Sequence, residues 1–322
     1  MARLKIGIIG CGGIANGKHL PSLKAIDRAD IVAFCDLIPE RAEKAAKEYG
    51  VEGAKVYTDY RELLEDESID VVYVLTPNRS HADISIDALH AGKHVMCEKP
   101  MAKCAADARR MVEAAKETGK KLTIGYQHRQ KAESQYVKAC IDRGDLGEIY
   151  YAKAYAIRRR GTPNWGVFLN EYEQGGGPLI DIGTHALDLT LWEMDNYEPA
   201  MVVGSTFRKL ADTENAANAW GSWDPKKFTV EDSAFGFIKM KNGATIVLES
   251  SWALNTLLTS EAKTILCGTK GGADMLGPEG SSLRLNGERF SKMYETIPNL
   301  AASGAAFFDG ETGGKAEEIE AR

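Results

Sequence analysis

The sequence has no apolar stretch close to the roughly 20 residues that a membrane-spanning helix requires. It also has no long run of basic residues, and its net charge at pH 7 is −6. These absences argue against a membrane protein and recommend neither nucleic acid nor an anionic membrane as a partner. Hydrophobic residues make up 44% of the chain and charged residues 27%, as in an ordinary globular protein. A strand-like segment begins near residue 4, which leaves no room for a signal peptide.

Cysteine is sparse and shows no metal-binding pattern. The six cysteines form neither a CxxC pair nor a cluster with zinc-ligand spacing. Most lie in apolar runs, as small buried side chains do in a reducing compartment. We therefore expect a cytoplasmic protein without a metal site. The six residues are Cys11, Cys35, Cys97, Cys104, Cys140 and Cys267.

A glycine-rich turn follows the first strand-like run. Residues Leu4 to Ile9 read LKIGII, which is typical of a strand buried on both faces. The next six residues, Gly10 to Ala15, read G-x-G-x-x-A and include Gly12, Gly13 and Ile14. In a dinucleotide-binding turn the first glycine closes the turn, and the second lets the backbone approach a pyrophosphate. The helix that follows would direct its N-terminal amides at that pyrophosphate.

The second strand supports the same interpretation. A second apolar run, Asp30 to Cys35, ends at Asp36, about 20 residues after the motif, where a carboxylate that binds the ribose is expected. A glycine turn in an unrelated α/β protein would not account for Asp36. The sequence therefore predicts a dinucleotide site.

The pattern of the chain changes near residue 125, and 322 residues suffice for two domains. Before that point strands alternate with helices, which predicts a doubly wound parallel sheet. After about Ser134 one clear helix, Gly177 to Met194, interrupts strand-like runs, and Asn242-Gly243 marks a hairpin. The runs are Ile149 to Arg160, Met201 to Lys209, Thr229 to Lys241, Thr245 to Ala253 and Ala262 to Cys267. We predict an α/β protein with a Rossmann domain at residues 1–125 and, at residues 126–322, an α+β domain with an open-faced, mainly antiparallel sheet.

Ligands of doubly wound sheets gather at the carboxyl ends of the strands. His81, one helical turn beyond Asn78, either faces the same crevice or is a solvated helix residue. Tyr126 follows the last strand and is either a substrate or cofactor contact or a core residue. The residues expected to line the cofactor site are Gly10, Gly12, Gly13, Ile14, Asp36, Thr76, Pro77, Asn78, His81, Glu98 and Lys99.

A polar stripe lies on the helix of the second half. Asp181, His185 and Asp188 have the three- and four-residue spacings of neighbours on one helical face. Apolar residues occupy the other faces, so the stripe would be buried and would need partners. It is either a satisfied structural pair or an acid/base site, with the glycines at 175–177 allowing a ligand to approach the backbone.

These segments together resemble the Gfo/Idh/MocA family of glucose–fructose oxidoreductases and inositol dehydrogenases. The matching pieces are GCGGIA at Gly10 to Ala15, CEKP at Cys97 to Pro100, GYQHR at Gly125 to Arg129, and GGGPLIDIGTHALDL at Gly175 to Leu189. The resemblance implies a Rossmann domain followed by a substrate domain. It also implies oxidation of a secondary hydroxyl of a sugar, cyclitol or glycoside, or the reverse reduction, with NAD or NADP.

By position, Lys99, Asp181 and His185 match the family's catalytic set, and a cis Lys99–Pro100 bond is expected. A neutral imidazole at His185 can accept the hydroxyl proton, with Asp181 stabilising the imidazolium. Lys99 can steady the developing alkoxide or act as the base itself, and the sequence does not decide between Lys99 and His185.

The expected substrate residues are less clearly marked. Arg158 and Arg160 alternate along a strand, so they either form a solvated strand edge or bind substrate beside Trp165, whose flat ring suits a pyranose. Together with Tyr126, Asp181 and His185, Arg158 and Trp165 form the predicted substrate site.

Three further expectations concern cofactor, mechanism and assembly. Asp36 without an arginine at 36–38 favours NAD over NADP. Two alternatives to a dehydrogenase are an NAD-retaining glycosidase or lyase that acts by transient oxidation, and a non-catalytic nucleotide-binding regulator. The segment 315–322 resembles the beginning of an amphipathic helix, so we expect a longer natural chain or a subunit that covers the exposed patch. A homo-oligomer, a dimer or tetramer formed through the C-terminal sheet, is expected.

Overall fold

The computed structural model describes residues 3–276 and 283–300. These residues form two compact units, which meet in the sequence at Gly125 and Tyr126, and each is described here by itself. The segment 301–322, including the expected terminal helix, lies outside the described residues.

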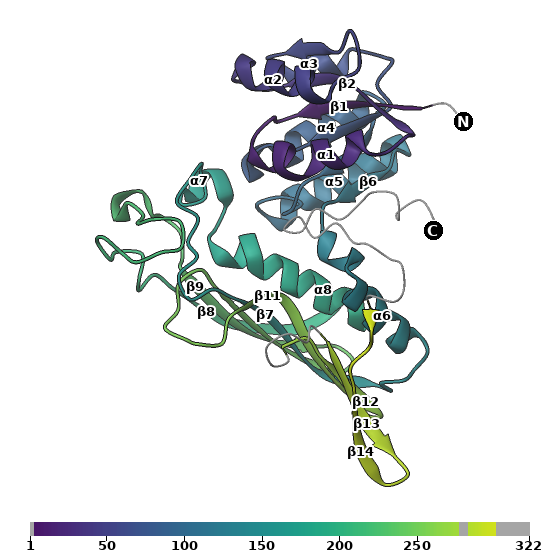
Figure 1. The fold of residues 1–322 in the computed structure, drawn as a ribbon, viewed down its shortest axis with the longest axis vertical. Coiled ribbons are helices and arrows are strands. Elements are labelled where there is room, and N and C mark those ends of the chain that lie inside the picture. The colour runs from purple at the N-terminus through teal and green to yellow at the C-terminus, as the bar shows by residue number, and fades with distance from the viewer. Residues whose placement is uncertain (1–2, 277–282, 301–322) are drawn as a thin grey trace. The chain divides into compact units, whose positions relative to one another are not determined.

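The first unit is built on a six-stranded parallel sheet with the strand order β3-β2-β1-β4-β5-β6 (Figure 1). Its strands are β1 (Leu4–Ile9), β2 (Ala29–Cys35), β3 (Lys55–Tyr57), β4 (Val71–Val74), β5 (His94–Cys97) and β6 (Leu122–Ile124). The helical segments between them are η1 (Ala15–His19), α1 (Leu20–Lys24), α2 (Pro39–Tyr49), α3 (Tyr60–Leu64), η2 (Asn78–Ser80), α4 (His81–His90) and α5 (Ala105–Thr118).

Two apolar clusters cover the two faces of this sheet. One joins Ile6 and Ile8 of β1 to α1 and α2 and contains the fully buried Phe34 of β2. The other joins Val72 and Val74 of β4 to α3, α4 and α5. Burial on both faces explains why the strands are continuous apolar runs in the sequence. The predicted doubly wound parallel sheet is confirmed.

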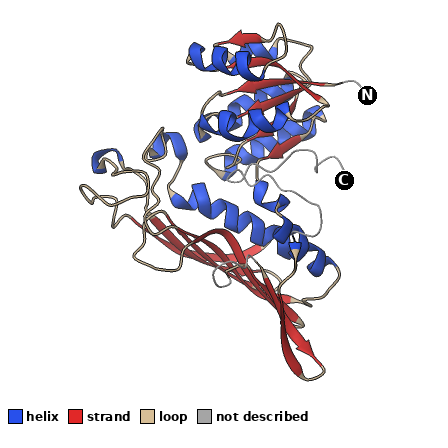
Figure 2. Cartoon of the chain, viewed as in Figure 1, coloured by secondary structure: helices blue, strands red, loops and turns tan. Residues whose placement is uncertain are grey.

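The second unit carries an eight-stranded sheet with the strand order β14-β13-β12-β11-β7-β10-β9-β8. Figure 2 draws the strands in red. Its strands are β7 (Ile149–Ile157), β8 (Pro199–Phe207), β9 (Ser233–Met240), β10 (Thr245–Ser251), β11 (Ser260–Gly268), β12 (Gly271–Asp274), β13 (Arg284–Arg289) and β14 (Lys292–Thr296). Its helical segments are η3 (Gln127–Gln130), α6 (Ala132–Asp142), α7 (Glu171–Gln174), η4 (Leu179–Gly183), α8 (Thr184–Met194) and η5 (Pro225–Lys227).

All pairs in this sheet are antiparallel except β7 with β10, so the mainly antiparallel sheet is also confirmed. The Asn242-Gly243 turn joins β9 to β10 as predicted, with Gly243 at φ +95°. The expected strand from Ile149 ends at Ile157 rather than Arg160. The strands β12 to β14 were not predicted, because they are short and rich in glycine and charged residues.

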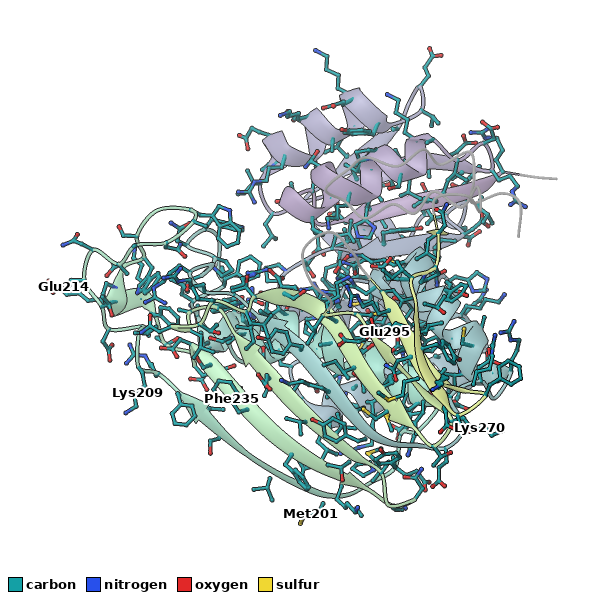
Figure 3. The ribbon with its side chains drawn as sticks, turned by 60° about the horizontal axis from the view of Figure 1, so that its bottom comes forward. Met201, Lys209, Glu214, Phe235, Lys270 and Glu295 are labelled. Atoms are coloured by element: carbon teal, nitrogen blue, oxygen red, sulfur yellow. The ribbon has the colours of Figure 1, made fainter. Side chains whose placement is uncertain are left out.

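Helix α8 lies along one face of this sheet (Figure 1). Ala152, Ala154 and Ala156 of β7 are fully buried and belong to the core cluster that also contains Ala186 and Leu189 of α8. Small side chains on β7 allow the helix to pack closely, which makes α8 a rigid support for the side chains at its beginning. Among the described elements, none covers the opposite face of β8 and β9, where Met201 and Phe235 are seen in Figure 3.

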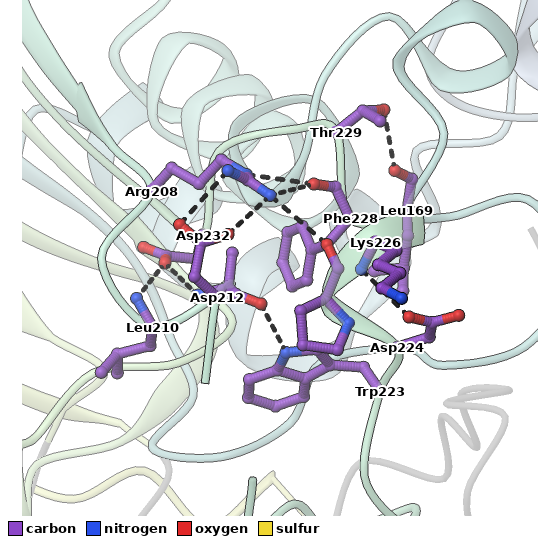
Figure 4. A network of polar contacts seen from close by, with 12 residues as sticks. Leu169, Arg208, Leu210, Asp212, Trp223, Asp224, Lys226, Phe228, Thr229 and Asp232 are labelled. Atoms are coloured by element: carbon purple, nitrogen blue, oxygen red, sulfur yellow. Dashed lines mark hydrogen bonds and ion pairs between the residues drawn. The ribbon is translucent and has the colours of Figure 1, made fainter. Parts of the chain in front are cut away.

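A long connection, residues 208–232, joins β8 to β9 and is held by a polar network (Figure 4). Buried Asp232 accepts hydrogen bonds from the amides of Leu210 (2.6 Å) and Ala211 (2.9 Å). Arg208 donates to the carbonyl oxygen of Phe228, and Trp223 Nε1 donates to that of Ala211 (2.8 Å). These bonds fix the connection, in which the only helical segment among its residues 208–232 is the short η5.

Candidate active site

The glycine-rich turn after β1 has the geometry of a pyrophosphate cradle. Gly10 has φ +94°, and an added Cβ would lie 2.6 Å from the carbonyl oxygen of Leu75, so only glycine fits. At Gly12 and Gly13 nothing lies within 4 Å of an added Cβ. Ile14 already has helical dihedral angles, so the first amides of the helix point toward this open space. The turn therefore has room and donors for the pyrophosphate of a dinucleotide.

Asp36, at the carboxyl end of β2, ties that strand to the turn. Its Oδ2 accepts a hydrogen bond from the amide of Cys11 (2.8 Å), and its Oδ1 accepts one from the amide of Ile38 (2.9 Å). The carboxylate is half-buried beside the cradle. This position fits the predicted contact with a ribose.

Glu98 and Lys99 follow β5, and the peptide bond between Lys99 and Pro100 is cis, as expected. Glu98 Oε1 lies 2.7 Å from His19 Nε2, and Glu98 Oε2 accepts a hydrogen bond from the amide of Lys99 (3.0 Å). Burial would raise the pKa of Glu98, but His19 and Lys99 outweigh burial and hold that pKa below its ordinary value. His19 thus links the first helix to the residue pair that carries Lys99.

His19 reaches Glu98 from a wide turn. Residues Ala15–His19 form a π-helical turn, and the amide of Leu20 donates to the carbonyl oxygen of Ala15 five residues earlier. The next residue, Pro21, has no amide hydrogen to donate. The π-helical hydrogen bonds therefore end at Leu20, where α1 begins. Single π-turns often occur at functional sites.

The structure corrects the prediction for His81. Its side chain is fully buried, neither facing a crevice nor solvated. Nδ1 lies 2.8 Å from the carbonyl oxygen of Pro100, and Nε2 lies 2.8 Å from that of Thr76. Both ring nitrogens are therefore occupied by the protein's own backbone, and the residue joins the Pro100 loop to the end of β4 instead of offering a group to a cofactor.

In the second unit, the helix that carries the polar stripe begins with a second π-turn, Leu179–Gly183, where we predicted a continuous α-helix. Glu231 accepts hydrogen bonds from the amides of Gly177 (2.8 Å) and Leu179 (3.1 Å), so its carboxylate caps this beginning. Gly183 allows close packing, because an added Cβ would lie 2.8 Å from Ser250 Oγ of β10.

The glycines before this helix serve the protein's own packing, contrary to the idea that they admit a ligand. Gly175 has φ +82° and ends α7. An added Cβ at Gly177 would lie 2.1 Å from the backbone oxygen of Glu231. These two glycines are required by chain geometry, and the space beside Gly177 is already filled.

Asp181 sits in the π-turn with a defined orientation. Trp252, fully buried directly after β10, donates its indole Nε1–H to Asp181 Oδ2 (2.9 Å). A buried indole that donates to a carboxylate fixes the direction of that carboxylate. Trp252 was not predicted as a site residue.

His185 lies on the next turn, in α8, and only 8% of its surface is exposed. Its ring makes edge contacts with the rings of His128 (centroids 4.8 Å apart) and Tyr126 (6.1 Å). The Tyr126 hydroxyl is 2.8 Å from Thr184 Oγ1. The imidazole is thus held between α8 and the aromatic side chains of Tyr126 and His128.

The third member of the stripe, Asp188, forms a two-point ion pair with Arg129. Arg129 Nε donates to Asp188 Oδ2 (2.8 Å), and Nη2 donates to Oδ1. The pair raises the pKa of Arg129, and it anchors the GYQHR segment to α8. Asp188 therefore serves a structural ion pair, and Asp181 and His185 at the helix start remain the candidates for chemistry.

Arg158 is not a solvated edge residue, because its guanidinium is held by acceptors of the protein itself. Its Nη2 donates to Glu261 (2.7 Å) and its Nη1 to the carbonyl oxygen of Gly161 (3.0 Å). Burial lowers the pKa of Arg158, but Glu261 and Asp181 outweigh burial and raise it. The guanidinium lies 5.3 Å from the ring centroid of Trp220, beside which Trp165 is half-exposed.

The predicted residues therefore fall into two groups. The first unit brings together the cradle, Asp36, Glu98 and Lys99, and the second brings together Asp181, His185 and Tyr126, with Arg158 and Trp165 nearby. Sequence reasoning missed His19, Glu231 and Trp252, whose partners are distant along the chain. His128 lay inside the GYQHR match and could have been found there.

Among residues 3–276 and 283–300, no group of three His, Cys, Asp or Glu side chains could hold a metal ion, and no helix is long and apolar enough to cross a membrane. All six cysteines lie in the described part of the chain and are free thiols. Burial raises the pKa of Cys11, Cys35 and Cys97 to about 12, so these thiols are not nucleophiles at neutral pH.

Comparison with known families identifies the chain. Residues 4–126 match the model of the Gfo/Idh/MocA oxidoreductase family with an NAD-binding Rossmann fold, and residues 134–274 match a Gfo/Idh/MocA C-terminal domain. The chain belongs to the Gfo/Idh/MocA family. It is an oxidoreductase, and its first domain is of the NAD-binding Rossmann type.

Relatives and solved structures agree with this assignment. The chain is 39% identical to D-glucoside 3-dehydrogenase of Escherichia coli K12 over 294 residues, which cover 91% of this chain and 83% of that protein. It is 40% identical to inositol 2-dehydrogenase of Salmonella typhimurium LT2 over 147 residues, 45% of this chain and 43% of that protein. An aldose-aldose oxidoreductase from Caulobacter crescentus superposes with a TM-score of 0.73 at 25% identity, covering 92% of this chain and 84% of that one. Levoglucosan dehydrogenase in complex with NADH shares the fold at 21% identity, with a TM-score of 0.76, covering 92% of this chain and 80% of that one.

Proposed function

We propose that this chain is an NAD-dependent dehydrogenase that oxidises a secondary hydroxyl of a sugar, cyclitol or glycoside, or catalyses the reverse reduction. The observation that carries the proposal is the helix start of the second unit. There Asp181 and His185 lie on consecutive turns, one oriented by Trp252 and the other held by His128 and Tyr126. Relatives with sugar and cyclitol dehydrogenase activities support the same reaction class.

The chemistry assigns a role to each domain. We assign cofactor binding to residues 1–125, through the cradle, Asp36 and the ends of β4 and β5, and substrate binding to the residues from 126 onward. NAD, when bound, supplies the acceptor for the hydride. His185 accepts the hydroxyl proton as a neutral imidazole, and Asp181 stabilises the imidazolium that results. Lys99 steadies the negative charge that develops on the oxygen.

The experiment combines a substrate panel with variants of these residues. We expect purified protein with NAD to produce reduced cofactor from at least one sugar, inositol or glycoside. His185→Ala should lower kcat by about 10²–10⁴ with a smaller effect on KM, because a general base acts mainly in the transition state. Asp181→Asn should lose less, and Lys99→Ala should impair both parameters. Near-normal turnover in His185→Ala would show that the Asp181–His185 pair is structural.

Cofactor preference follows from the charge at Asp36. No arginine or lysine occupies positions 36–38, where Leu37 and Ile38 are exposed. A 2′-phosphate about 4 Å from this carboxylate would be repelled by ~4 kcal/mol at an effective dielectric near 20, before screening. Even a third of that is roughly tenfold in affinity. Comparing kcat/KM for NAD and NADP tests the preference, and equal values would contradict it.

We also propose a homo-oligomer formed through the uncovered face of the second sheet. Met201 and Val203 of β8 and Phe237 of β9 are exposed large apolar residues there, and Val203 pairs with Phe237 across the two strands. Exposed apolar surface of this kind marks association sites. Light scattering should give a dimer or tetramer, and a monomer of 35.1 kDa would contradict the proposal.

A further inference from the structure

Two tryptophans from distant parts of the second unit form an exposed aromatic corner. Trp165 lies in the loop after β7, and Trp220 lies in the connection between β8 and β9. Their ring centroids are 4.9 Å apart, and the ring planes meet at 85°. Trp165 is 50% exposed and Trp220 46% exposed, whereas Trp252 and Trp223 are buried in the same unit. Leaving two large apolar rings half in water forgoes burial free energy that the chain gains elsewhere.

The corner is held rigidly by hydrogen bonds between its two loops. Asn164 Nδ2 donates to the carbonyl oxygens of Trp220 (2.6 Å) and Gly221 (3.0 Å). The Asn218 side chain accepts from the amide of Thr162 (2.9 Å) and donates to its carbonyl oxygen (2.9 Å). A corner fixed in this way loses little conformational entropy when a ligand binds, which is the advantage of a preorganised site.

The corner is also connected to the elements that hold Asp181. The Arg158 guanidinium packs over the Trp220 ring at 5.3 Å and lies within electrostatic range of Asp181. The amide of Gly161 donates to the carbonyl oxygen of Trp252, the residue whose indole binds Asp181 (2.8 and 2.9 Å). The aromatic corner therefore continues the proposed substrate site.

We propose that Trp165 and Trp220 form a subsite for the part of a glycoside that is not oxidised, a second ring attached to the sugar that reacts. This inference rests on the proposed dehydrogenase function and names its substrate class. The C–H face of a pyranose and the face of an aromatic aglycone are both flat and apolar, so either can pack on an indole ring. Two indole rings at nearly right angles can contact such a group on two of its sides. Free monosaccharides and cyclitols lack the group that would occupy the corner.

The test compares substrates that differ only in this second group. Phenyl glucoside, a glucose disaccharide, methyl glucoside and free glucose are assayed with wild type, Trp165→Ala and Trp220→Ala. We expect each variant to lose about tenfold or more in kcat/KM for the two-ring substrates, mostly through KM, and less than about twofold for methyl glucoside and glucose. Phe290→Ala, which removes an exposed aromatic ring from the β13–β14 hairpin, is the matched control and should change neither group.

The outcomes separate the subsite from the reaction. Equal losses for all four compounds, or no loss for the two-ring compounds, would overturn the subsite while leaving the dehydrogenase intact. Calorimetric titration with the same compounds tests the subsite independently of turnover. Wild type should bind phenyl glucoside more tightly than methyl glucoside, whereas Trp220→Ala should bind the two compounds with equal affinity. Equal binding of both compounds to wild type would also overturn the subsite, whereas reduced cofactor from none of the panel would overturn the proposed function instead.

Discussion

Asp181 is oriented by Trp252, a buried residue. The indole N–H, the one polar group of this side chain, donates to the Asp181 carboxylate. We predict that Trp252→Phe, which keeps a ring but removes the indole N–H, lowers kcat by about tenfold, or about 1.4 kcal/mol. Without the indole N–H the Asp181 carboxylate would be held less firmly and would stabilise the imidazolium of His185 less well. KM should change little, because the substrate does not contact this nitrogen. Steady-state kinetics measures both parameters.

Trp223→Phe is the matched control for that variant. Trp223 is also buried, and its Nε1 donates to the carbonyl oxygen of Ala211 in the polar network of the 208–232 connection (Figure 4). Both variants lose one buried hydrogen bond, so both should lose stability by about 1–3 kcal/mol. Only Trp252→Phe should lower kcat. Equal effects on kcat would show that Trp252 acts through general stability.

Glu193, on α8, is a fully buried carboxyl group. Neither of its oxygens has a hydrogen-bond partner among the described residues, and the hydroxyl of nearby Thr264 donates to Met275 Sδ (3.6 Å). Burial raises the pKa of Glu193 to about 8, against the opposing charges of Lys138 and Lys263. In the native state Glu193 therefore stays protonated up to about pH 8, whereas in the unfolded chain it loses this proton above pH 4.5.

This difference predicts the sign of a pH dependence. Between the unfolded pKa of 4.5 and the native pKa of about 8, stability from this group falls as pH rises, by at most roughly 1.4 kcal/mol per pH unit. Glu193→Gln is neutral at every pH, so it should be more stable relative to wild type at pH 8 than at pH 5. Urea unfolding at the two pH values measures this, with exposed Glu198→Gln as control. Parallel pH profiles for wild type and Glu193→Gln would contradict the assignment.

At the scale of elements, the proposed cofactor cradle and the proposed acid/base pair each lie where a helix begins with a π-turn. The glycines beside the two turns differ in role. Gly12 faces open space, so Gly12→Ala should leave the melting temperature nearly unchanged while weakening NAD binding by tenfold or more, because the methyl group occupies the cradle. Gly17 lies in the first π-turn and also has nothing within 4 Å of an added Cβ. Because Gly17 lies beyond the glycine-rich turn, Gly17→Ala should leave both the melting temperature and NAD binding unchanged. Calorimetry with NAD and thermal unfolding measure the two effects.

Gly177→Ala provides the opposite case. Its Cβ would collide with the Glu231 backbone, so stability should fall by about 1–3 kcal/mol or more. If Gly12→Ala destabilised the fold as much as Gly177→Ala, the cradle would be a packing site. If Gly12→Ala bound NAD normally, the cradle would not hold the pyrophosphate.

The elements that the sequence predicted are those whose signals are local. The first strand, the glycine motif and Asp36 are contiguous or nearly so, and the strand predicted at Leu4 to Ile9 is β1. The partners that define the site are not local: Trp252 is 71 residues from Asp181, and Glu261 is 103 residues from Arg158. For this reason the sequence did not reveal that Glu261 and Gly161 hold Arg158, and its contact with a substrate stays a prediction. His81 was predicted to face the crevice or solvent, because its position in α4 does not reveal the Pro100 carbonyl oxygen that it binds.

At the scale of the whole molecule, the two units divide the chemistry that the family requires. The first carries the cradle, Asp36 and Lys99, and the second carries the proposed acid/base pair and the aromatic corner. A dehydrogenase needs both on one substrate, because hydride and proton leave the same carbon–oxygen unit. An enzyme that returned the hydride within each cycle would use the same residues but would accumulate no reduced cofactor.

The most direct test follows the hydride of a glucoside deuterated at its ring carbons, incubated with the purified protein and NAD. We expect reduced cofactor to accumulate, one molecule for each molecule of keto product, and mass spectrometry to find one deuterium in each reduced nicotinamide. A product formed by cleavage or elimination with no net reduced cofactor, or no product at all across the panel of sugars, inositols and glycosides, would contradict this expectation.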